Sequence, residues 1–300
     1  MIPVIGTIEG VREQVASARR AGRSVGLVPT MGALHEGHAS LIRAARKETG
    51  CVVVSIFVNP IQFGLNEDLA RYPRNLEGDL ELCAREGVDL VFTPQPATLY
   101  PPGFTTYVEV QGLEDVLCGR SRPGHFRGVA TVVAKLLHIV QPDIAYFGQK
   151  DAQQARIIQQ MVRDLDIPVE LRICPIAREP DGLALSSRNR HLSPEERRQA
   201  TVLYRTLDEV RTRIESGERE AEALRQLMRE NVRRTPGVVL DYVDVVSADT
   251  LQPLERVEGQ VLVALAVKFG GTRLIDNLTL FVRETRTTHG QPGQFDFKKI

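Results

Sequence analysis

Short apolar runs rich in valine and isoleucine alternate with amphipathic stretches over about the first 177 residues of the chain. The apolar runs predict strands at Val25–Val28, Cys51–Val58, Leu90–Thr93, Ile144–Phe147 and Val169–Cys174. The stretches between them predict helices at Val11–Ala21, His38–Thr49, Leu76–Glu86, Val129–Val140 and Ala152–Leu165. Apolar strands separated by helices are typical of an α/β fold, in which helices cover both faces of a parallel sheet. Ligands of such sheets bind beyond the carboxyl ends of the strands.

A different pattern follows this region. Ser193 and Glu196 have the spacing of a capping box, which predicts a helix start. The rest of the pattern predicts helices at about 194–217 and 219–233, and strands at Val238–Val246, Val261–Phe269 and Arg273–Asp276. We therefore expect a parallel-sheet domain over 1–177 and a smaller α+β domain over 178–283. Residues 284–300 are polar and rich in Gly and Gln, which is typical of a flexible tail.

Composition and charge narrow the functional classes. The 38 Lys and Arg residues balance the 38 Asp and Glu residues, so no global field favours nucleic acid or an anionic membrane. No apolar run is long enough to span a bilayer, and no signal sequence begins the chain. The four cysteines are scattered singly, which argues against disulfides and structural zinc, and Cys51 and Cys174 are expected in the core. We expect a reduced, cytoplasmic protein that binds neither nucleic acid nor membrane.

The strongest chemical signal is the segment Pro29–His38, which reads Pro-Thr-Met-Gly-Ala-Leu-His-Glu-Gly-His. It joins a predicted strand to a predicted helix through a tight turn. The first turn of such a helix offers unpaired N–H groups and the positive end of its dipole, which suits phosphate. His35 and His38 are three residues apart at the same mouth, where they could neutralise charge in a phosphate transition state.

Other interpretations of this segment remain open. A Gly-containing turn is a weak signal by itself, and a histidine at a helix start is often a cap or a surface residue. A zinc site of the zincin type needs histidines four residues apart, whereas His35 and His38 are three apart and no third ligand is evident. Phosphate chemistry is the interpretation that we favour.

Further polar clusters follow other predicted strands. Gln62, in the Asn-Pro loop after the second strand, can both donate and accept hydrogen bonds, although such a residue is common in loops. Lys150 lies just before a helix for which Asp151 is the expected N-cap, and it is either a phosphate-binding charge or a solvated lysine. The segment Leu185–Asn189 carries two hydroxyls and a guanidinium, and is either a phosphate clamp or a polar linker.

The remaining histidines give weaker signals. His125 is expected in a loop, with either a structural or a binding role. His138 lies on an apolar helix pattern and is expected to be a core residue, and His191 and His289 are expected on the surface.

Together and in this order, these clusters resemble the pantoate–β-alanine ligase family of the HIGH-motif nucleotidyltransferase superfamily. The matching segments are Pro29–His38, Ser55–Gly64, Arg71–Arg74, Arg122–Gly128, Phe147–Asp151 with Gln154, Asp181–Asn189 and Thr272–Asn277. The resemblance implies a Rossmann-like N-terminal domain, a smaller C-terminal lid and a homodimer. It also implies a reaction that uses Mg²⁺ with ATP, joins (R)-pantoate to β-alanine through a pantoyl-adenylate, and releases pyrophosphate and AMP.

The resemblance also implies roles for single residues. His35, His38, Lys150 and Arg188 correspond to catalytic positions. Those that would contact ATP are Met31, Gly32, Ala33, Leu34, His35, Glu36, Gly37, His38, Gly148, Gln149, Lys150, Asp151, Ala177, Leu185, Ser186, Ser187 and Arg188. Gln62 and Gln154 would hold pantoate, Gln62 also lying near β-alanine, and Asp79 would accompany the nucleotide-bound metal.

Three positions depart from the family pattern without removing a reacting group: Gln149 stands for Glu, Ala152 for an aromatic residue and Ala177 for Val. The expected chemistry needs positioning and charge stabilisation more than a covalent nucleophile, and no Cys or Ser nucleophile is evident. Two rival functions remain. One is a nucleotidylyltransferase that makes a stable product such as NAD or dephospho-coenzyme A, and the other is a regulatory protein that binds nucleotide without turnover.

Overall fold

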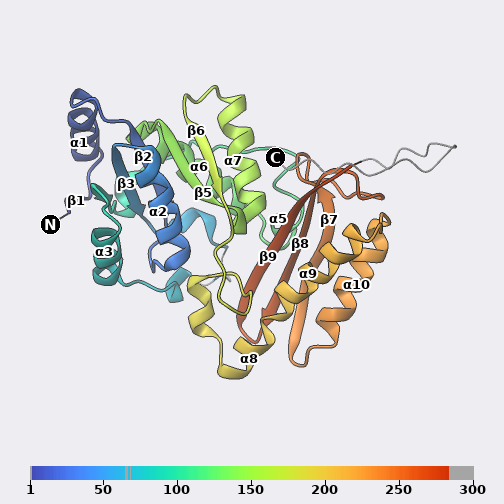
Figure 1. Cartoon of the computed structure of the whole chain (residues 1–300). Coiled ribbons are helices and arrows are strands. Elements are labelled where there is room, and N and C mark those ends of the chain that lie inside the picture. Colours follow the sequence, from blue (N-terminus) through green and yellow to red (C-terminus); the bar gives the residue numbers. More distant parts are fainter. Residues whose placement is uncertain (1, 65–66, 68, 284–300) are drawn as a thin grey trace.

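The N-terminal part of the protein is built on a six-stranded parallel sheet with the strand order β1-β4-β3-β2-β5-β6. The computed structural model describes residues 2–64, 67 and 69–283 (Figure 1). The strands are β1 (Val4–Ile5), β2 (Val25–Thr30), β3 (Cys51–Ile56), β4 (Leu90–Phe92), β5 (Ile144–Gly148) and β6 (Glu170–Cys174). This parallel sheet confirms the α/β expectation.

Helices cover both faces of this sheet. Alternate residues of β3 show why, because Val53 packs into the core under α1, α6 and α7, whereas Val52 and Val54 pack against α2 and α3. The helices of this part are α1 (Ile8–Arg20), α2 (Glu36–Glu48), α3 (Leu76–Arg85), α4 (Pro96–Leu99), α5 (Cys118–Ser121), α6 (His125–Val140) and α7 (Ala152–Asp164). The structure also has three 3₁₀ turns in this part: η1 (Pro60–Gln62) and η2 (Leu69–Arg71) between β3 and α3, and η3 (Gln149–Asp151) between β5 and α7.

The C-terminal part is a three-stranded antiparallel sheet, β7 (Val238–Ser247), β8 (Gly259–Phe269) and β9 (Thr272–Val282). The helices α9 (Val202–Glu215) and α10 (Ala221–Arg233) pack on one face of it. The 3₁₀ turn η4 (Ser187–His191) and helix α8 (Pro194–Gln199) precede them. The smaller α+β part that the sequence predicts is therefore present.

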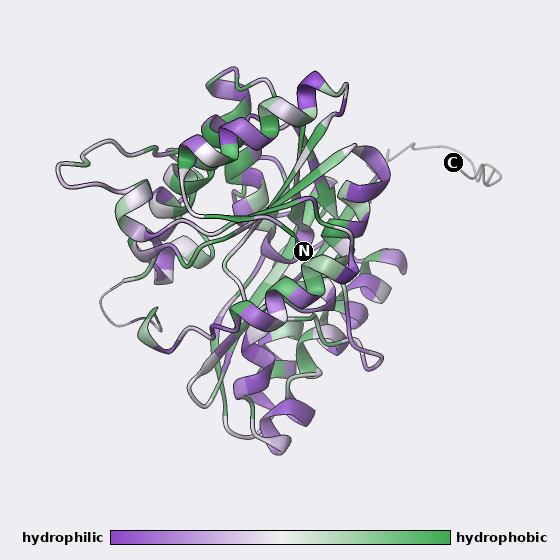
Figure 2. Ribbon diagram, turned by 90° about the vertical axis from the view of Figure 1, so that its left-hand side faces the viewer, coloured by the Kyte–Doolittle hydropathy of each residue, from purple (hydrophilic) through white to green (hydrophobic). Residues whose placement is uncertain are grey.

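The other face of the antiparallel sheet meets the parallel-sheet part. Val246, Leu251, Leu262 and Ala264 are buried in the same hydrophobic cluster as residues of β2, β3 and α6. In Figure 2 the apolar colouring concentrates on strands and on inward-facing helix sides, and hydrophilic residues line the outer sides of the helices. The two sheets thus share a continuous core.

Several predicted boundaries differ from the structure. β1 was not predicted, because two residues, Val4 and Ile5, are too short a run to show a pattern. The single helix expected at 194–217 is two helices, since the Thr201 hydroxyl donates to the Arg198 carbonyl at 2.8 Å between them. β9 continues well past Asp276, and its apolar residues Leu278, Leu280 and Val282 pack against the core under α9 and α10.

Three single-residue expectations were wrong. His125 is the first residue of α6 and is buried, because Gly124 adopts a φ of 76° that turns the chain into the helix. His138 is exposed, and its Nδ1 lies 2.7 Å from the Ala134 carbonyl oxygen, one turn earlier in the helix. Cys174 is half-buried at the end of the edge strand β6, whereas Cys51 is in the core as expected.

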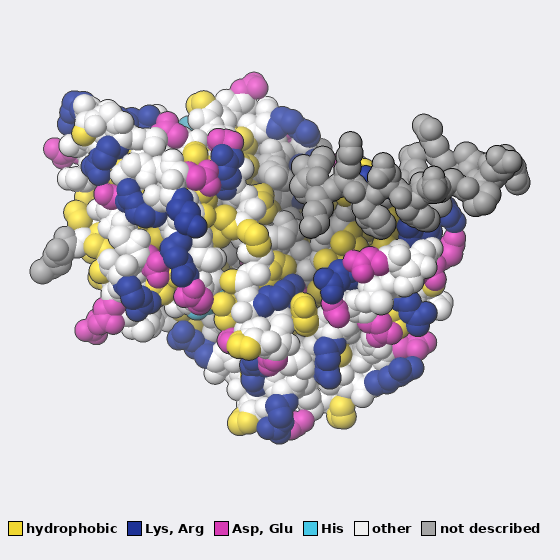
Figure 3. Space-filling view, viewed as in Figure 1, with side chains coloured by type: hydrophobic (Ala, Val, Ile, Leu, Met, Phe, Trp, Pro, Cys, Tyr) yellow, Lys and Arg dark blue, Asp and Glu magenta, His cyan; other side chains and the backbone are white. Residues whose placement is uncertain are grey.

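The remaining expectations concern the cysteines, membrane spans, surface charge, the domain division and the C-terminal tail. All four cysteines are free thiols. No helix within the described ranges combines the length and apolar character that crossing a bilayer requires. On the face shown in Figure 3, Lys and Arg are interspersed with Asp and Glu. The domain division after residue 177 stays a prediction, and the tail at 284–300 with His289 lies outside the described residues.

Candidate active site

The loop between β2 and α2 is held by a buried carboxylate. Asp79 of α3 is only 3% exposed and accepts the backbone N–H groups of Ala33 and Leu34 at 2.9 and 2.6 Å. Gly32 and Ala33 have φ angles of 84° and 50°, so the loop takes a left-handed path that suits glycine. Burial raises the pKa of Asp79, and its hydrogen bonds to the loop oppose that shift. The loop therefore has a fixed shape before any ligand arrives.

His35 and His38 form a close pair of tilted rings at the start of α2, with ring centroids 4.1 Å apart and an angle of 48° between the ring planes. His35 is the N-cap, and its Nδ1 accepts the Gly37 N–H at 3.1 Å. The Nδ1 of His38 accepts the His35 N–H at 3.2 Å. Because Nδ1 is the acceptor in both rings, we assign the proton of each neutral imidazole to Nε2.

The structure makes both imidazoles neutral at neutral pH. Burial, helped by the positive charge of Lys150, lowers the pKa of His35 to about 4. Burial, His35 and Lys150 lower the pKa of His38 to about 3. The free site therefore holds uncharged Nε2–H donors rather than the cations that would neutralise phosphate charge. These donors can still bind a phosphate oxygen through hydrogen bonds.

Gln62, in the turn η1 that follows β3, is held by a buried amide network. Its Oε1 accepts from Asn59 at 3.0 Å, and its Nε2 lies 3.0 Å from Met31 Sδ. Asn59 also donates to the Gly128 carbonyl at 3.1 Å and accepts from the Tyr100 hydroxyl at 2.7 Å. The side chain of Gln62 therefore has a defined direction.

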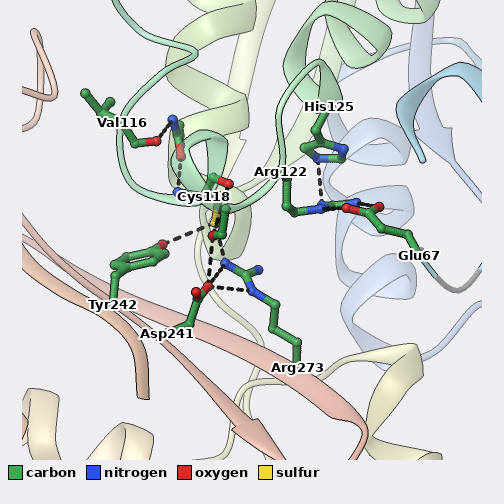
Figure 4. A network of polar contacts seen from close by, with 10 residues as sticks. Glu67, Val116, Cys118, Arg122, His125, Asp241, Tyr242 and Arg273 are labelled. Carbon is green, nitrogen blue, oxygen red and sulfur yellow. Dashed lines mark hydrogen bonds and ion pairs between the residues drawn. The ribbon is translucent and has the colours of Figure 1, made fainter. Parts of the chain in front are cut away.

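A second chain of contacts holds the backbone of Gln62. The His125 Nδ1–H donates to the Gln62 carbonyl at 2.8 Å, and Arg122 donates to His125 Nε2 at 2.9 Å. Arg122 also makes a bidentate ion pair with Glu67, at 2.7 and 2.5 Å (Figure 4). Burial and Arg122 lower the pKa of His125 to about 4, so this histidine is neutral and structural.

The turn after β5 presents Lys150. The Asn277 amide of β9 donates to the carbonyls of Gln149 and Lys150 at 2.9 and 3.0 Å. Asp151 is the N-cap residue of α7, as expected, although its side chain makes no capping bond. It lies instead 3.8 Å from the Lys150 ammonium. Gln154 follows in the first turn of α7.

The segment between the two sheets closes the site. Leu185 donates to the Ala177 carbonyl at 2.9 Å, which folds this segment back on itself. Ser186 is the N-cap of η4 and accepts the Arg188 N–H at 3.3 Å. The Arg188 guanidinium lies over the Tyr72 ring, 5.6 Å from its centroid.

Most of the predicted site residues meet at one cavity of about 220 Å³. Those that line it are Met31, His35, Gly37, His38, Gln62, Gly148, Lys150, Asp151, Gln154, Ala177, Leu185, Ser186, Ser187 and Arg188. Gly32, Ala33, Leu34, Glu36, Asp79 and Gln149 do not. Glu36 is exposed and pairs with Arg43, and Gln149 donates to Asn277 and Thr279. The ligand-binding roles of the lining residues and of these six stay predictions.

A larger cavity of about 970 Å³ adjoins the first and shares Lys150, Asp151, Gln154, Ser186 and Arg188 with it. Contacts between the two parts of the chain border it (Figure 4). The Arg273 guanidinium donates to Cys118 Sγ at 3.4 Å, and Cys118 Sγ lies 3.2 Å from the Tyr242 hydroxyl. The second cavity thus lies where the two parts meet.

The side chains fit a metal that arrives with a nucleotide better than a metal bound by protein alone. Across the described residues, no group of three or more His, Cys, Asp or Glu side chains is placed to hold a metal ion. Asp151 is the carboxylate among the described lining residues of the smaller cavity. Mg²⁺ is commonly held by one or two carboxylates together with substrate phosphates. Asp79 lies away from the cavity and anchors the loop, and its metal role stays a prediction.

Several structural partners were not assigned from the sequence: Asn59, Tyr100, Arg122, Asp276 and Asn277. Four of them lie in the segments that match the family, and Tyr100 does not. A polar residue within an apolar strand, as at Asp276 and Asn277, is the signal that could have found them.

The fold and the site define an α/β enzyme that acts on a phosphate-bearing ligand. A profile of the family described as Pantoate-beta-alanine ligase matches residues 3–279. The chain belongs to this family and is a ligase that forms an amide bond.

Similar proteins agree with this assignment. The chain is 58% identical to the pantothenate synthetase of Moorella thermoacetica, over 94% of this chain and 99% of the relative. A crystal structure of the enzyme from Thermus thermophilus has 48% identity and a TM-score of 0.88, covering 92% of this chain and 99% of that one. The pantoate-β-alanine ligase of Francisella tularensis, complexed with beta-gamma ATP and β-alanine, has 36% identity and a TM-score of 0.76, covering 93% and 97%.

Proposed function

We propose that the chain condenses (R)-pantoate with β-alanine in two steps that consume ATP. In the first step a pantoate carboxylate oxygen attacks the α-phosphorus, the bond to the β-phosphate oxygen breaks, and pyrophosphate leaves. In the second step the β-alanine nitrogen attacks the acyl carbon, the bond to AMP breaks, and the amine loses a proton. The first step turns the carboxylate, which is a poor acyl donor, into a mixed anhydride with a good leaving group.

One observation carries this proposal. Two neutral imidazoles, one ammonium group and two glutamine amides line the same cavity of about 220 Å³. Hydrogen-bond donors and a fixed positive charge suit the developing charge of phosphoryl transfer, which needs little covalent chemistry from a protein. The amides suit a second ligand that carries hydroxyl and carboxylate groups.

The proposed roles follow from these positions. His35, His38 and Lys150 stabilise the charge on the phosphates, and Gln62 and Gln154 hold pantoate. Arg188, where the two parts of the chain meet, helps to close the site and exclude water, which protects the anhydride from hydrolysis.

Magnesium, the assembly and the location are further parts of this proposal. Mg²⁺ bound to the ATP phosphates would offset their negative charge, and Asp151 is the lining carboxylate that could contact it. The resemblance supports a homodimer, and the four free cysteines support a reducing cytoplasm. Light scattering across a range of protein concentrations tests the dimer.

A single assay separates this function from its rivals. The enzyme is given MgATP and pantoate, with and without β-alanine, and pyrophosphate, AMP and pantothenate are followed. We expect pyrophosphate release with pantoate alone, and AMP and pantothenate only when β-alanine is added. A stable adenylylated product that ignores β-alanine would indicate a nucleotidylyltransferase, and no turnover would indicate a regulatory protein.

Isotope labelling tests the chemical route. Pantoate labelled with ¹⁸O in its carboxylate should deliver one label to AMP, because the attacking oxygen stays on the α-phosphate. Label in inorganic phosphate would instead show an acyl-phosphate route and contradict the proposal.

A further inference from the structure

Two buried polar residues interrupt the apolar pattern of β9. Asp276 and Asn277 are 1% and 4% exposed. Neighbouring residues of a strand point to opposite faces of the sheet. Leu274 and Leu278 pack with α9 and α10, and Ile275 packs with the core of the parallel-sheet part. Asp276 therefore lies on the helix-covered face, and Asn277 faces the parallel-sheet part.

The side-chain amide of Asn277 forms hydrogen bonds with the turn that carries Lys150. Its Nδ2 donates to the carbonyl oxygens of Gln149 and Lys150 at 2.9 and 3.0 Å. Its Oδ1 accepts from Gln149 Nε2 at 3.2 Å. One side chain of the antiparallel sheet thus fixes two consecutive peptide groups in the other part of the molecule. Both N–H groups of the amide are used, so the arrangement is specific for this orientation of the turn.

Asp276 fixes the second segment of the site from the same strand. It accepts both Arg178 Nη atoms, at 2.6 and 2.9 Å, and Arg178 also donates to the Gly182 carbonyl at 2.9 Å. Arg178 directly follows Ala177, which lines the cavity. Both sides of the candidate nucleotide site are therefore bonded to adjacent residues of β9.

We propose that Asn277 is a positioning residue for Lys150, which it places through the backbone of the turn. The lysine is on one part of the chain and its support is on the other, so the ammonium reaches its working position only while the antiparallel sheet is docked. Small displacements of a charge-stabilising group cost rate steeply. The inference rests on the proposed role of Lys150 and extends it.

The test begins with Asn277→Asp. The carboxylate has the shape of the amide but would put an oxygen against two carbonyl oxygens, which repels the turn. We expect the single-turnover rate of pantoyl-adenylate formation to fall about 10²-fold, with a much smaller change in the dissociation constant for ATP. Asn277→Ala, which removes the donors without adding repulsion, should lower the rate less.

Thr279→Val is the matched control. Thr279 lies two residues further along β9 on the same face, and its hydroxyl accepts from the Gln149 side chain at 3.0 Å rather than bonding the backbone of the turn. Its variant should form the adenylate at a rate close to that of the unchanged protein.

A double-mutant cycle with Lys150→Ala decides between positioning and general damage. If Asn277 acts through Lys150, Asn277→Asp should cost little in a protein that already lacks the ammonium. If Asn277→Asp lowers the rate equally in the unchanged protein and in Lys150→Ala, as a loss of folded protein would, the inference is overturned. An unchanged rate for Asn277→Asp alone also overturns it. Failure of the underlying function is seen separately, as a normal rate for Lys150→Ala by itself.

Discussion

His38 is a hydrogen-bond donor that carries no charge. Its Nδ1 is occupied by the His35 N–H, and its pKa of about 3 keeps the ring neutral. The proton on Nε2 can then be offered to a phosphate oxygen without the cost of burying a cation in the free site. A site of this kind is organised before its substrate arrives, so little reorganisation accompanies the reaction.

Removing this donor should slow adenylation and leave the fold intact. For His38→Ala and Lys150→Ala we expect losses of about 10²–10³-fold in the single-turnover rate, the range for one preorganised donor. His138→Ala is the control, because that histidine is exposed on α6. A rate for either site variant that matches the control would contradict the role assigned to it.

His125 links folding stability to pH. Its ordinary pKa of 6.5 falls to about 4 in the folded protein, so between these values the unfolded chain binds a proton that the folded protein does not. Stability is therefore fully present above pH 6.5 and is lost as the pH falls toward 4. His125→Asn should flatten this dependence by up to about 1.4 kcal/mol per pH unit, measured by urea unfolding.

The pH slope has an internal control. His138→Asn changes an exposed histidine of the same helix and should leave the slope unchanged. A slope for His125→Asn that equals that of the unchanged protein would show that His125 is already protonated when folded, contrary to its contacts with Arg122 and the Gln62 carbonyl.

The sequence was enough to predict which residues belong to the site. It was not enough to predict their protonation states or the distant residues that hold them in place. The segments around His38 and Lys150 were found because strand, turn and helix follow one another along the chain. The neutral state of the histidines depends on burial, and the supports at Asp79 and Asn277 come from distant segments. Local patterns hold no information on such pairings.

At the scale of elements, α6 approaches the turn η1 very closely beside the site. A Cβ atom on Gly128 would lie 2.5 Å from the Ile61 carbonyl oxygen and 2.7 Å from Gln62 Cα. Both are backbone atoms, so neither can turn away. Gly128 therefore lets the helix lie directly against the turn that presents Gln62.

Gly128→Ala should displace that turn. We expect a loss of about 1–3 kcal/mol in stability from overpacking, together with a higher KM for pantoate and an unchanged dissociation constant for ATP. Gly6→Ala is the control, since the nearest atom to its added Cβ is the Thr93 carbonyl oxygen at 3.4 Å. An equal weakening of ATP binding would show that η1 supports the whole site rather than the pantoate side.

Elements with a strong local pattern were predicted well, and their ends less well. The core strands β2, β3 and β5 lie where apolar runs placed them. The extension of β9 to Val282 was missed because exposed residues such as Thr279 and Phe281 alternate with its apolar ones. A strand with one covered face shows only this period-two pattern, which tertiary pairing with β8 then stabilises.

At the scale of the whole molecule, Arg188 borders both cavities between the two parts of the chain. For Arg188→Ala we expect kcat/KM for ATP to fall about 10- to 100-fold, since a charged hydrogen-bonding group is lost. We also expect AMP to exceed pantothenate, because a less closed site admits water to the anhydride. The product ratio is measured by chromatography of quenched reactions.

Arg198→Ala provides the comparison for this variant. Arg198 lies on α8, where it is largely exposed and pairs with Glu195. It should give AMP and pantothenate in equal amounts. If Arg188→Ala also gives equal amounts, Arg188 binds nucleotide without helping to exclude water.

The shared core has a consequence for how the chain is made. During translation, β1 to β6 are synthesised well before Val246, Leu251, Leu262 and Ala264. These four side chains belong to the same hydrophobic cluster as residues of β2 and β3. Until these residues emerge, part of the apolar surface of the nascent parallel-sheet part of the chain faces water. That interval is when the growing polypeptide is most exposed to aggregation and to chaperone binding. Premature termination before Ala264 would leave the same surface open for good, and would mark the fragment for degradation.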